Sequence, residues 1–370
     1  KNPPQLQGAR APGTRPARLS AGYFAARKVG ERMLFNRSKS VVGLDIGSSS
    51  IKVVEMEPAG ETHRLKDFGV AELLPEAIVD GEIMDRQLVV ETIQNLFEQK
   101  RLKSRNIVSA VSGRAVIVKK ILMDRLAEED AREAIHWEAE QHVPYDINDV
   151  SLDFQILDEE ANPKQMQVLP VAAKRDMLNA HADLVREAGL SPVVIDVDSF
   201  AVQNAILANY DFTPEEVVAL VNIGAEITNI NIIQGGMPHF TQDLSLGGNT
   251  FVEAVMKKHN VSQSEALAAI RGQEAPSFDL KAVVEEVCED LATAIERSIV
   301  YLKTSGDTER ITRLMLSGGG VRIPGIVDFL ARRHQVPVEI ADPLRRIQYN
   351  PALFGDADPG WVRCVVLDAA

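Results

Sequence analysis

The sequence predicts an α/β protein of two lobes, with a smaller α+β module inserted into the first lobe. Short apolar strands alternate with amphipathic helices from residue 40 onward. Two strand–turn–strand units with related glycine patterns, at residues 41–57 and 216–234, indicate two similar lobes. Between them, a strand, a helix and two further strands within residues 116–189 indicate a compact α+β unit.

The elements of the first lobe follow from apolar periodicity. Residues 41–46 form an apolar run that predicts a buried strand, and residues 51–57 alternate as its hairpin partner. The remaining elements expected in this lobe are a helix at 85–99, strands at 106–111 and 192–197, and a helix at 199–208.

The inserted module is predicted from similar patterns and from its breaker residues. The helix at 128–142 ends before Pro144, because the residue before a proline avoids the helical region. The helix at 176–188 is closed by Gly189. Strands are expected at residues 116–122, 150–157 and 165–172.

The second lobe is predicted to contain most of the helices. A hairpin joins the strands 216–223 and 228–234, and a third strand follows directly. The full set for this lobe is strands at 216–223, 228–234, 237–244 and 313–316, and helices at 250–259, 262–270, 278–304 and 324–334.

Bulk composition favours a soluble protein of a reducing compartment. The chain has 370 residues, of which 45% are hydrophobic and 25% charged, so it can bury a large core without disulfides. Cys288 and Cys364 lie far apart and form no disulfide framework. No membrane span or cleavable signal peptide is expected, and the seven histidines lack zinc-ligand spacing. These features predict a cytoplasmic protein.

Charge is distributed unevenly along the chain. Residues 1–40 carry a net charge of +8, whereas the remainder carries −21. The acidic body argues against nucleic acid as the main partner. Residues 1–39 are predicted to be a disordered basic extension. Two alternatives are a short lipid-contacting helix around residues 23–35 and a natural start at Met33.

Three loops carry the candidate chemistry. In the first, the strand ending at Asp45 is followed by Gly47, Ser48 and Ser49, and Lys52 lies on the return strand. Small residues allow backbone N–H groups to approach a phosphate, the lysine adds positive charge, and Asp45 can hold Mg²⁺ through water. An ordinary Gly-Ser hairpin turn explains this loop equally well when it is considered alone.

The second and third loops repeat this design. The second loop carries Asn222, Gly224 and Thr228 between two apolar strands. The third follows a buried strand with Ser317 and the glycines 318–320, whose backbone a flat adenine–ribose unit can approach closely. The ordered set favours a split phosphate site. No Walker lysine motif or lone G-x-G-x-x-G fingerprint is present, which argues against a P-loop NTPase and a Rossmann dehydrogenase.

The chain resembles the FtsA/PilM family of the actin/Hsp70/sugar-kinase superfamily, and within it the actin-like PilM proteins of type IV pilus assembly. The resemblance is carried by three motifs: the first hairpin at residues 42–55, the connecting segment 194–204, and Ser-Leu-Gly-Gly-Asn at 245–249. It implies a two-lobed actin-like ATPase fold whose inserted module is the SHS2-like 1C subdomain. It extends over nearly all of residues 33–365.

The implied boundaries divide the chain into five parts. Lobe I (1A) takes residues 40–115 and 190–215, the 1C subdomain residues 116–189, and lobe II (2A/2B) residues 216–345. The basic extension precedes lobe I, and residues 346–370 are expected to pack back on it.

The resemblance also implies the roles of individual residues. ATP phosphates are expected at Gly47, Ser48, Ser49 and Lys52 of one lobe, and at Asn222, Gly224 and Thr228 of the other. Ribose and adenine are expected at Gly247, Gly248, Gly318, Gly319 and Gly320. Asp45 and Asp196 are the candidates for water-mediated Mg²⁺ binding and for any catalytic role.

One departure from the family pattern limits the expected activity. The second hairpin of relatives usually begins with Asp, and here Asn222 is neutral, so it neither attracts Mg²⁺ nor orients water as a carboxylate does. Glu226 replaces a small residue near the expected phosphates. The expectation is ATP binding with slow or absent hydrolysis.

The resemblance implies a scaffold peripheral to the inner membrane that functions in pilus assembly and twitching motility. Its expected partner is the cytoplasmic N-terminal segment of PilN, in a groove between 1A and 1C. Helices around residues 135–143 and 178–184 are the candidate lining, with core packing as the alternative. PilO indirectly, the motor ATPases and the platform protein are further candidates, as is a homo-oligomer or ring. Membrane contact is expected mainly through the partner.

Two other functions remain open at this stage. An FtsA-like cell-division anchor would need a basic amphipathic tail, whereas residues 361–370 are apolar and nearly uncharged. A small-molecule kinase would need a catalytic carboxylate, for which Asp196 is available, but the 1C module argues against it.

Overall fold

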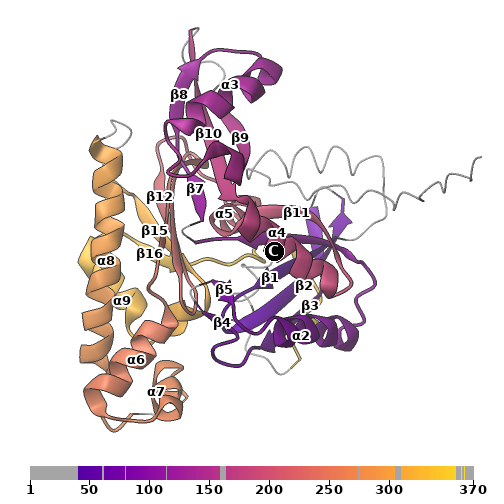
Figure 1. The fold of residues 1–370 in the computed structure, drawn as a ribbon. Helices are drawn as coiled ribbons and strands as arrows, with labels where there is room; N and C mark the ends of the chain where they lie inside the picture. The colour runs from indigo at the N-terminus through magenta and orange to yellow at the C-terminus, as the bar shows by residue number, and fades with distance from the viewer. Residues whose placement is uncertain are drawn as a thin grey trace, which may run out of the picture.

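A computed structural model describes residues 41–355, except 61, 80, 114, 159–163, 274–275 and 305–309, together with Gly360 and Val362. The expected basic extension lies outside the described residues. The chain forms two lobes, each built on its own sheet, and a smaller module that projects from them (Figure 1). Among the described residues, no helix is long and apolar enough to cross a membrane.

The first lobe is built on a six-stranded sheet in the order β11-β6-β1-β2-β3-β17. Its strands are β1 (Val41–Ile46), β2 (Ser50–Ala59), β3 (Thr62–Glu72), β6 (Asn106–Val111), β11 (Ser191–Val197) and β17 (Gln348–Tyr349). Strand β1 pairs antiparallel with β2 and parallel with β6. A short hairpin of β4 (Ile78–Val79) and β5 (Glu82–Ile83) leads to α2 (Arg86–Gln99).

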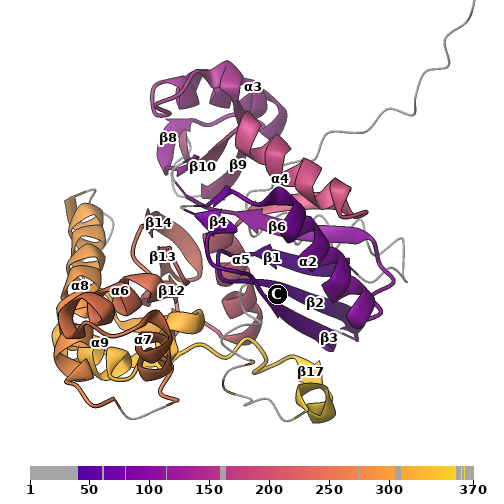
Figure 2. The same cartoon turned by 60° about the horizontal axis from the view of Figure 1, so that its bottom comes forward.

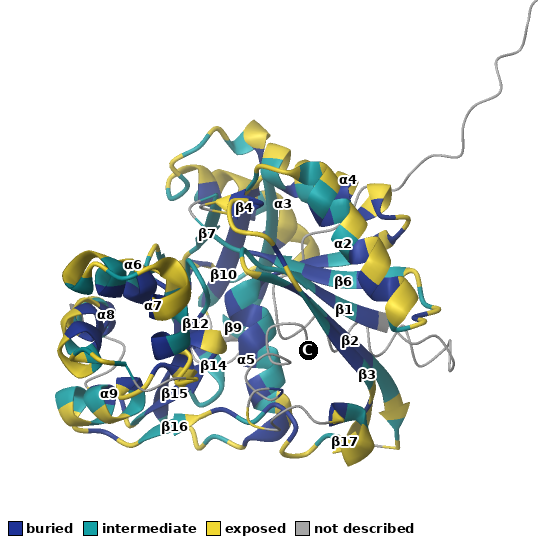
Figure 3. Ribbon diagram, turned by 90° about the horizontal axis from the view of Figure 1, so that it is seen from below, coloured by how far each residue is buried: buried dark blue, intermediate teal, exposed yellow. Residues whose placement is uncertain are grey.

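Helix α2 covers one face of this sheet because its apolar residues recur at helical spacing. Val89, Ile93, Leu96 and Phe97 are buried, and Asp85 caps the helix by accepting a hydrogen bond from the Leu88 N–H. Figure 3 shows the buried side of α2 turned toward β1 and β2.

The inserted module has its own sheet. It contains β7 (Val116–Val118), β8 (Ile121–Asp124), α3 (Glu128–Glu140), the 3₁₀ turn Ile147–Asp149, β9 (Val150–Asp158), β10 (Gln165–Lys174) and α4 (Arg175–Glu187). Helix α4 joins two hydrophobic cores. Leu178 and Ala182 pack in the core on the side of the module, and Leu184 and Val185 pack in the core of the first lobe.

The single strand expected at residues 116–122 is two strands. Strand β7 pairs with residues 171–173 of β10, and β8 pairs with residues 165–168. The break falls opposite Pro170, whose carbonyl accepts a hydrogen bond from the Lys119 N–H. Proline has no N–H to return, so the ladder is interrupted there.

The second lobe is built on a five-stranded sheet in the order β14-β13-β12-β15-β16. Its strands are β12 (Val217–Ile223), β13 (Thr228–Gln234), β14 (Met237–Leu244), β15 (Arg313–Ser317) and β16 (Val338–Ile340). Its helices are α6 (Gly248–His259), α7 (Gln263–Ile270), α8 (Leu280–Thr304) and α9 (Ile326–His334). Every residue of β12 is buried, because both faces of this central strand are covered.

The two main sheets repeat one arrangement. In each, the first strand forms a hairpin with the second, the third extends the hairpin, and two later strands add parallel to the first on its other side. This repetition confirms the prediction of two similar lobes.

The chain crosses between the lobes twice, and the two crossings touch. Helix α5 (Asp198–Asn209) leads into the second lobe, and residues 341–347 lead back. The Asn209 side chain donates to the Pro343 carbonyl at 2.7 Å and accepts from the Arg346 N–H at 2.8 Å. The Tyr210 hydroxyl accepts from the Asp342 N–H at 2.9 Å.

After the return crossing, the chain packs against the first lobe. Strand β17 pairs with β3, and the 3₁₀ turn Pro351–Phe354 follows (Figure 2). Phe354 lies edge-on to Phe68, with ring centroids 5.7 Å apart.

Candidate functional site

The first loop is a tight turn between β1 and β2. The Gly47 N–H donates to the Ser50 carbonyl at 3.1 Å. Asp45 and Lys52 are cross-strand partners, and the Lys52 ammonium donates to Asp45 Oδ2 at 2.6 Å. Ser48 is half-buried and Ser49 is exposed at the tip. The lysine and the aspartate therefore form an ion pair beside the turn.

The second loop is closed by Gly224, whose N–H donates to the Ile227 carbonyl at 2.9 Å. A Cβ at this position would lie 2.7 Å from the same carbonyl oxygen, so the turn requires glycine. Thr228 is fully buried, and its hydroxyl donates to the Leu246 carbonyl at 2.6 Å. This hydrogen bond holds the segment before α6 against the second loop.

The Gly247-Gly248 turn lies directly against the second loop. The Gly248 and Asn249 N–H groups donate to the carbonyls of Gly224 and Ala225, at 2.9 and 2.8 Å. A Cβ on Gly247 would lie 2.6 Å from the Ala225 oxygen. Two of the N–H groups that a helix start leaves unpaired are therefore satisfied by the hairpin.

The third loop packs on the second through two of its three glycines. A Cβ on Gly318, where φ is +82°, would lie 2.5 Å from Asn222 Oδ1. One on Gly320 would lie 2.3 Å from Ile223 Cγ2. Gly319 is exposed, and a Cβ there would meet nothing within 4 Å. Gly318 and Gly320 therefore shape the loop, and Gly319 is the glycine that a ligand can reach.

A polar row connects these loops to the first lobe. Ser317 Oγ donates to Asn222 Oδ1 at 3.1 Å, and Asn222 Nδ2 donates to Asn229 Oδ1 at 3.3 Å. Asn229 Nδ2 donates to Asp243 Oδ1 at 2.7 Å, and the other oxygen of Asp243 accepts from the Gly113 N–H at 2.6 Å. Asn229 and Asp243 were not predicted, although polar residues 229 and 231 in an apolar strand are a signal.

The structure thus joins the second loop, the third loop and the Gly247-Gly248 turn by direct contact. The first loop belongs to the other sheet, which the Gly113–Asp243 bond holds beside β14. Asp196 lies at the end of β11, is buried, and accepts from the Val197 N–H at 2.9 Å. Among the residues that the structure describes, no three His, Cys, Asp or Glu side chains cluster as metal ligands.

A half-buried histidine was also missed. His181 of α4 contacts Ser109 of β6, with Nε2 and Oγ 2.9 Å apart, and Ser109 donates its one hydroxyl proton to the Leu44 carbonyl at 2.7 Å. His181 Nε2 must therefore carry a proton and donate. Burial lowers the pKa of His181 to about 4, so the ring is neutral near pH 7.

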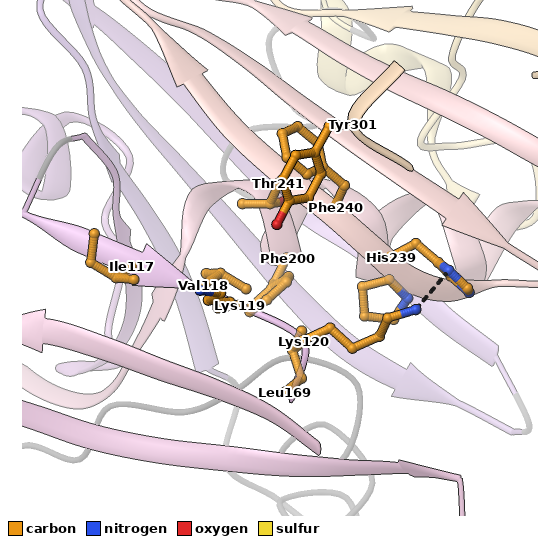
Figure 4. Close-up of a pocket in the computed structure, with 11 residues that line it drawn as sticks. Ile117, Val118, Lys119, Lys120, Leu169, Phe200, His239, Phe240, Thr241 and Tyr301 are labelled. Carbon is orange, nitrogen blue, oxygen red and sulfur yellow. Dashed lines mark hydrogen bonds between the residues drawn. The ribbon is translucent and has the colours of Figure 1, made fainter. Parts of the chain in front are cut away.

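A cavity of about 190 Å³ lies where the inserted module meets the second lobe. Its apolar lining includes Val118, Leu169, Phe200 and Phe240 (Figure 4). Lys120 and His239 approach each other across it, with Nζ and Nδ1 3.3 Å apart. The Thr241 hydroxyl, which points toward the Phe200 side, is buried without a hydrogen-bond partner. Such an atom favours a polar group or water in the cavity.

In the helices expected to line a groove between 1A and 1C, four apolar residues pack into cores, whereas Trp137 of α3 is exposed. Ile135 and Ala139 are buried in the module core, and Leu178 and Leu184 are buried in the cores beside α4. Core packing, the alternative interpretation, is correct for these four residues. Their apolar periodicity stabilises the helices against their own sheets.

Comparison with solved structures identifies the fold. A PilM–PilN type IV pilus biogenesis complex superposes with a TM-score of 0.79 at 27% identity, covering 90% of this chain and 97% of that one. The ethanolamine utilization protein EutJ of Carboxydothermus hydrogenoformans superposes at 0.52 with 15% identity, covering 82% and 85% of the two chains. The two repeated lobes with their glycine loops define an actin-like protein.

The sequence comparisons specify the family. The model of type IV pilus assembly protein PilM matches residues 43–355. The cell division protein FtsA of Bacillus subtilis (strain 168) is 22% identical over 355 residues, covering 83% of this chain and 80% of that one. The chain belongs to the PilM family, and FtsA is a more distant relative. The predicted fold class, family and role in type IV pilus assembly are confirmed.

Proposed function

We propose that this pilus assembly protein binds ATP between its lobes and holds the cytoplasmic segment of a PilN-type partner at its inserted module. The proposal rests chiefly on the contact between the second loop, the third loop and the Gly247-Gly248 turn. Three side-chain-poor turns from distant parts of the chain meet there, and Gly319 is exposed among them, so a flat or anionic ligand can approach its backbone closely.

The residues present fit a nucleotide. Gly319 offers open backbone for the nucleoside, and the first loop offers Ser48 and Ser49 beside the Lys52–Asp45 pair. Lys52 would hold phosphate charge, and Asp45 and Asp196 would hold waters of Mg²⁺, which would neutralise the phosphates.

Hydrolysis is expected to be slow. The Asn222 amide is neutral, and both of its polar atoms are engaged, with Ser317 and Asn229. It cannot accept a proton from an attacking water as a carboxylate can.

A pair of variants at Gly319 tests the ATP site. Gly319→Ala should fold and bind ATP, because its methyl group enters open space. Gly319→Asp should fold equally well but lower ATP affinity by about tenfold or more, since a carboxylate would face the nucleotide. Equilibrium binding of a fluorescent ATP analogue measures both. Equal ATP affinity in Gly319→Asp and wild type would show that the third loop is not part of the ATP site.

We place the partner segment in the cavity between β7 and β14. It is apolar inside, basic at Lys119 and Lys120, and bordered by β14, the last strand of its sheet. Extended segments bind at sheet edges, where their side chains enter such cavities. In this arrangement the protein is cytoplasmic and reaches the inner membrane through its partner.

Charge reversal and apolar disruption test this placement. Val118→Asp and Lys120→Glu should each weaken binding of a PilN N-terminal peptide by about tenfold, since both positions line the cavity. Lys281→Glu changes an exposed lysine of α8 and serves as the matched control. Fluorescence anisotropy measures the three affinities. If all three variants bind like wild type, the segment binds elsewhere.

A further inference from the structure

The Asp243 side chain joins the two lobes at the root of the inserted module. One carboxylate oxygen accepts from Asn229 Nδ2 at 2.7 Å and the other from the Gly113 N–H at 2.6 Å. Hydrogen bonds to an ionised carboxylate are stronger than neutral ones. A single side chain therefore holds β13 and the end of β6 at the same time.

One end of this connection reaches the glycine loops. Asn229 and Asn222 are both buried and bonded to each other, and Asn222 accepts from Ser317. Gly318 packs so closely on Asn222 that no Cβ fits between them. A ligand that moves the third loop must therefore move Asn222, and with it the amide of Asn229. We call the row Ser317, Asn222, Asn229, Asp243 and the Gly113 N–H the Asp243 bridge.

The other end reaches the cavity. Gly113 has a φ of +97°, and its carbonyl accepts from the Val116 N–H, which begins β7. Residues 117–120 form one side of the cavity, and residues 238–241 of β14 form the opposite side. Asp243 lies on that same strand, two residues beyond the cavity. Breaking the Gly113–Asp243 bond would weaken the connection between the two sides, which the Lys120–His239 contact also bridges.

We propose that the Asp243 bridge couples the glycine loops to the cavity, so that occupancy of one site changes the affinity of the other. This inference rests on the proposed function, because it assigns a regulation to those two sites. With the bridge formed, β7 is held at β14. With the bridge broken, the module is held less firmly at Gly113. Thermodynamic linkage requires the effect to be equal in both directions.

The first arm of the test needs no ligand. Hydrogen exchange of the Gly113 amide is measured in wild type, Asn229→Ala, Asp243→Asn and Gln242→Ala. Asn229→Ala leaves Asp243 in place but removes the amide that donates to it. Asp243→Asn keeps the shape of the side chain but has one acceptor oxygen instead of two. Both should speed Gly113 exchange by about tenfold. Gln242→Ala should not, because Gln242 contacts Ser298 of α8 instead. Unchanged exchange in both bridge variants would overturn the proposal.

The second arm measures coupling. Affinities for Mg·ATP and for the PilN N-terminal peptide are determined separately and together. Wild type and Gln242→Ala should show a coupling factor of about fivefold or more. Asn229→Ala and Asp243→Asn should bind the peptide with the same affinity whether or not Mg·ATP is present, which is a coupling factor near one.

The outcomes separate the two claims. If wild type binds both ligands independently, the coupling is wrong and the proposed function stands. If wild type binds neither ligand, the proposed function fails and the coupling fails with it. Equal coupling in wild type and both bridge variants would assign the regulation to other residues.

Discussion

His181 lies half-buried between the inserted module and the first lobe, in a setting that favours the neutral ring. It donates from Nε2 to Ser109, and Ser109 in turn donates to the backbone of β1 next to Asp45. The charged ring would lose solvation with no carboxylate in this contact to replace it. This residue ties α4 to the strand that leads into the first loop.

Acid should destabilise the protein through this residue. Its folded pKa is about 4 and the unfolded value is 6.5, so the unfolded chain takes up a proton first as the pH falls. Stability is unaffected above pH 6.5 and declines between pH 6.5 and 4, by about 2 kcal/mol at pH 5. Urea unfolding at pH 7 and pH 5 should show a smaller loss for His181→Gln, which keeps a donor, than for wild type. His136→Gln, at an exposed position, should lose as much as wild type.

At the residue scale, the sequence predicted the positions of the glycine turns more accurately than the contacts that each residue makes. Glycine and small residues after apolar strands identify turns without any tertiary information. It did not distinguish Gly318 and Gly320 from Gly319, because that difference depends on whether Asn222 and Ile223 lie beneath each glycine. Likewise, the Thr228 hydroxyl is bound to Leu246, a contact set only by folding.

At the element scale, long periodic segments were predicted well, whereas a strand interrupted by polar residues and two very short strands were missed. Helix α2 and strands β1, β6 and β13 occupy nearly the expected residues. Strand β3 was missed because His63, Arg64, Lys66 and Asp67 interrupt its apolar pattern, yet it pairs with β2 along most of its length. Strands β16 and β17 are too short for a pattern to emerge.

The turn after β17 should hold the return segment on the first lobe. Phe354 is buried against Phe68 and stacks on Tyr349. Phe354→Ala should cost about 3 kcal/mol, because a large side chain leaves the cluster around β3. Leu353→Ala, one position away and only partly buried, should cost clearly less. Chemical denaturation compares the two, and equal losses would contradict a specific role for the aromatic cluster.

At the scale of the whole molecule, the two lobes depend on the contacts between their crossings. Asn209 is 1% exposed and makes three hydrogen bonds, to Ala205, Pro343 and Arg346. The two carbonyl oxygens and the one N–H that its side chain binds all belong to the backbone, so removing the side chain leaves buried polar groups unpaired.

Asn209→Ala should therefore destabilise the protein by about 2 kcal/mol. Because the contact joins the lobes, calorimetry should also show a broader transition, as the lobes begin to melt separately. Asn249→Ala removes an exposed amide and should leave both the midpoint and the width unchanged. A sharp transition in Asn209→Ala would mean that other contacts hold the lobes together.

The paired crossings also restrict how the molecule can open. A single connecting segment between the two lobes would permit rotation in any direction. Two connections bonded side by side permit rotation about a single axis. In this protein the rotation axis passes near Asn209 and Tyr210, at the opposite end of α5 from Ser199. Small angular changes there become large displacements at the distal module, so its outermost helix, α3, should travel farthest whenever the lobes rotate.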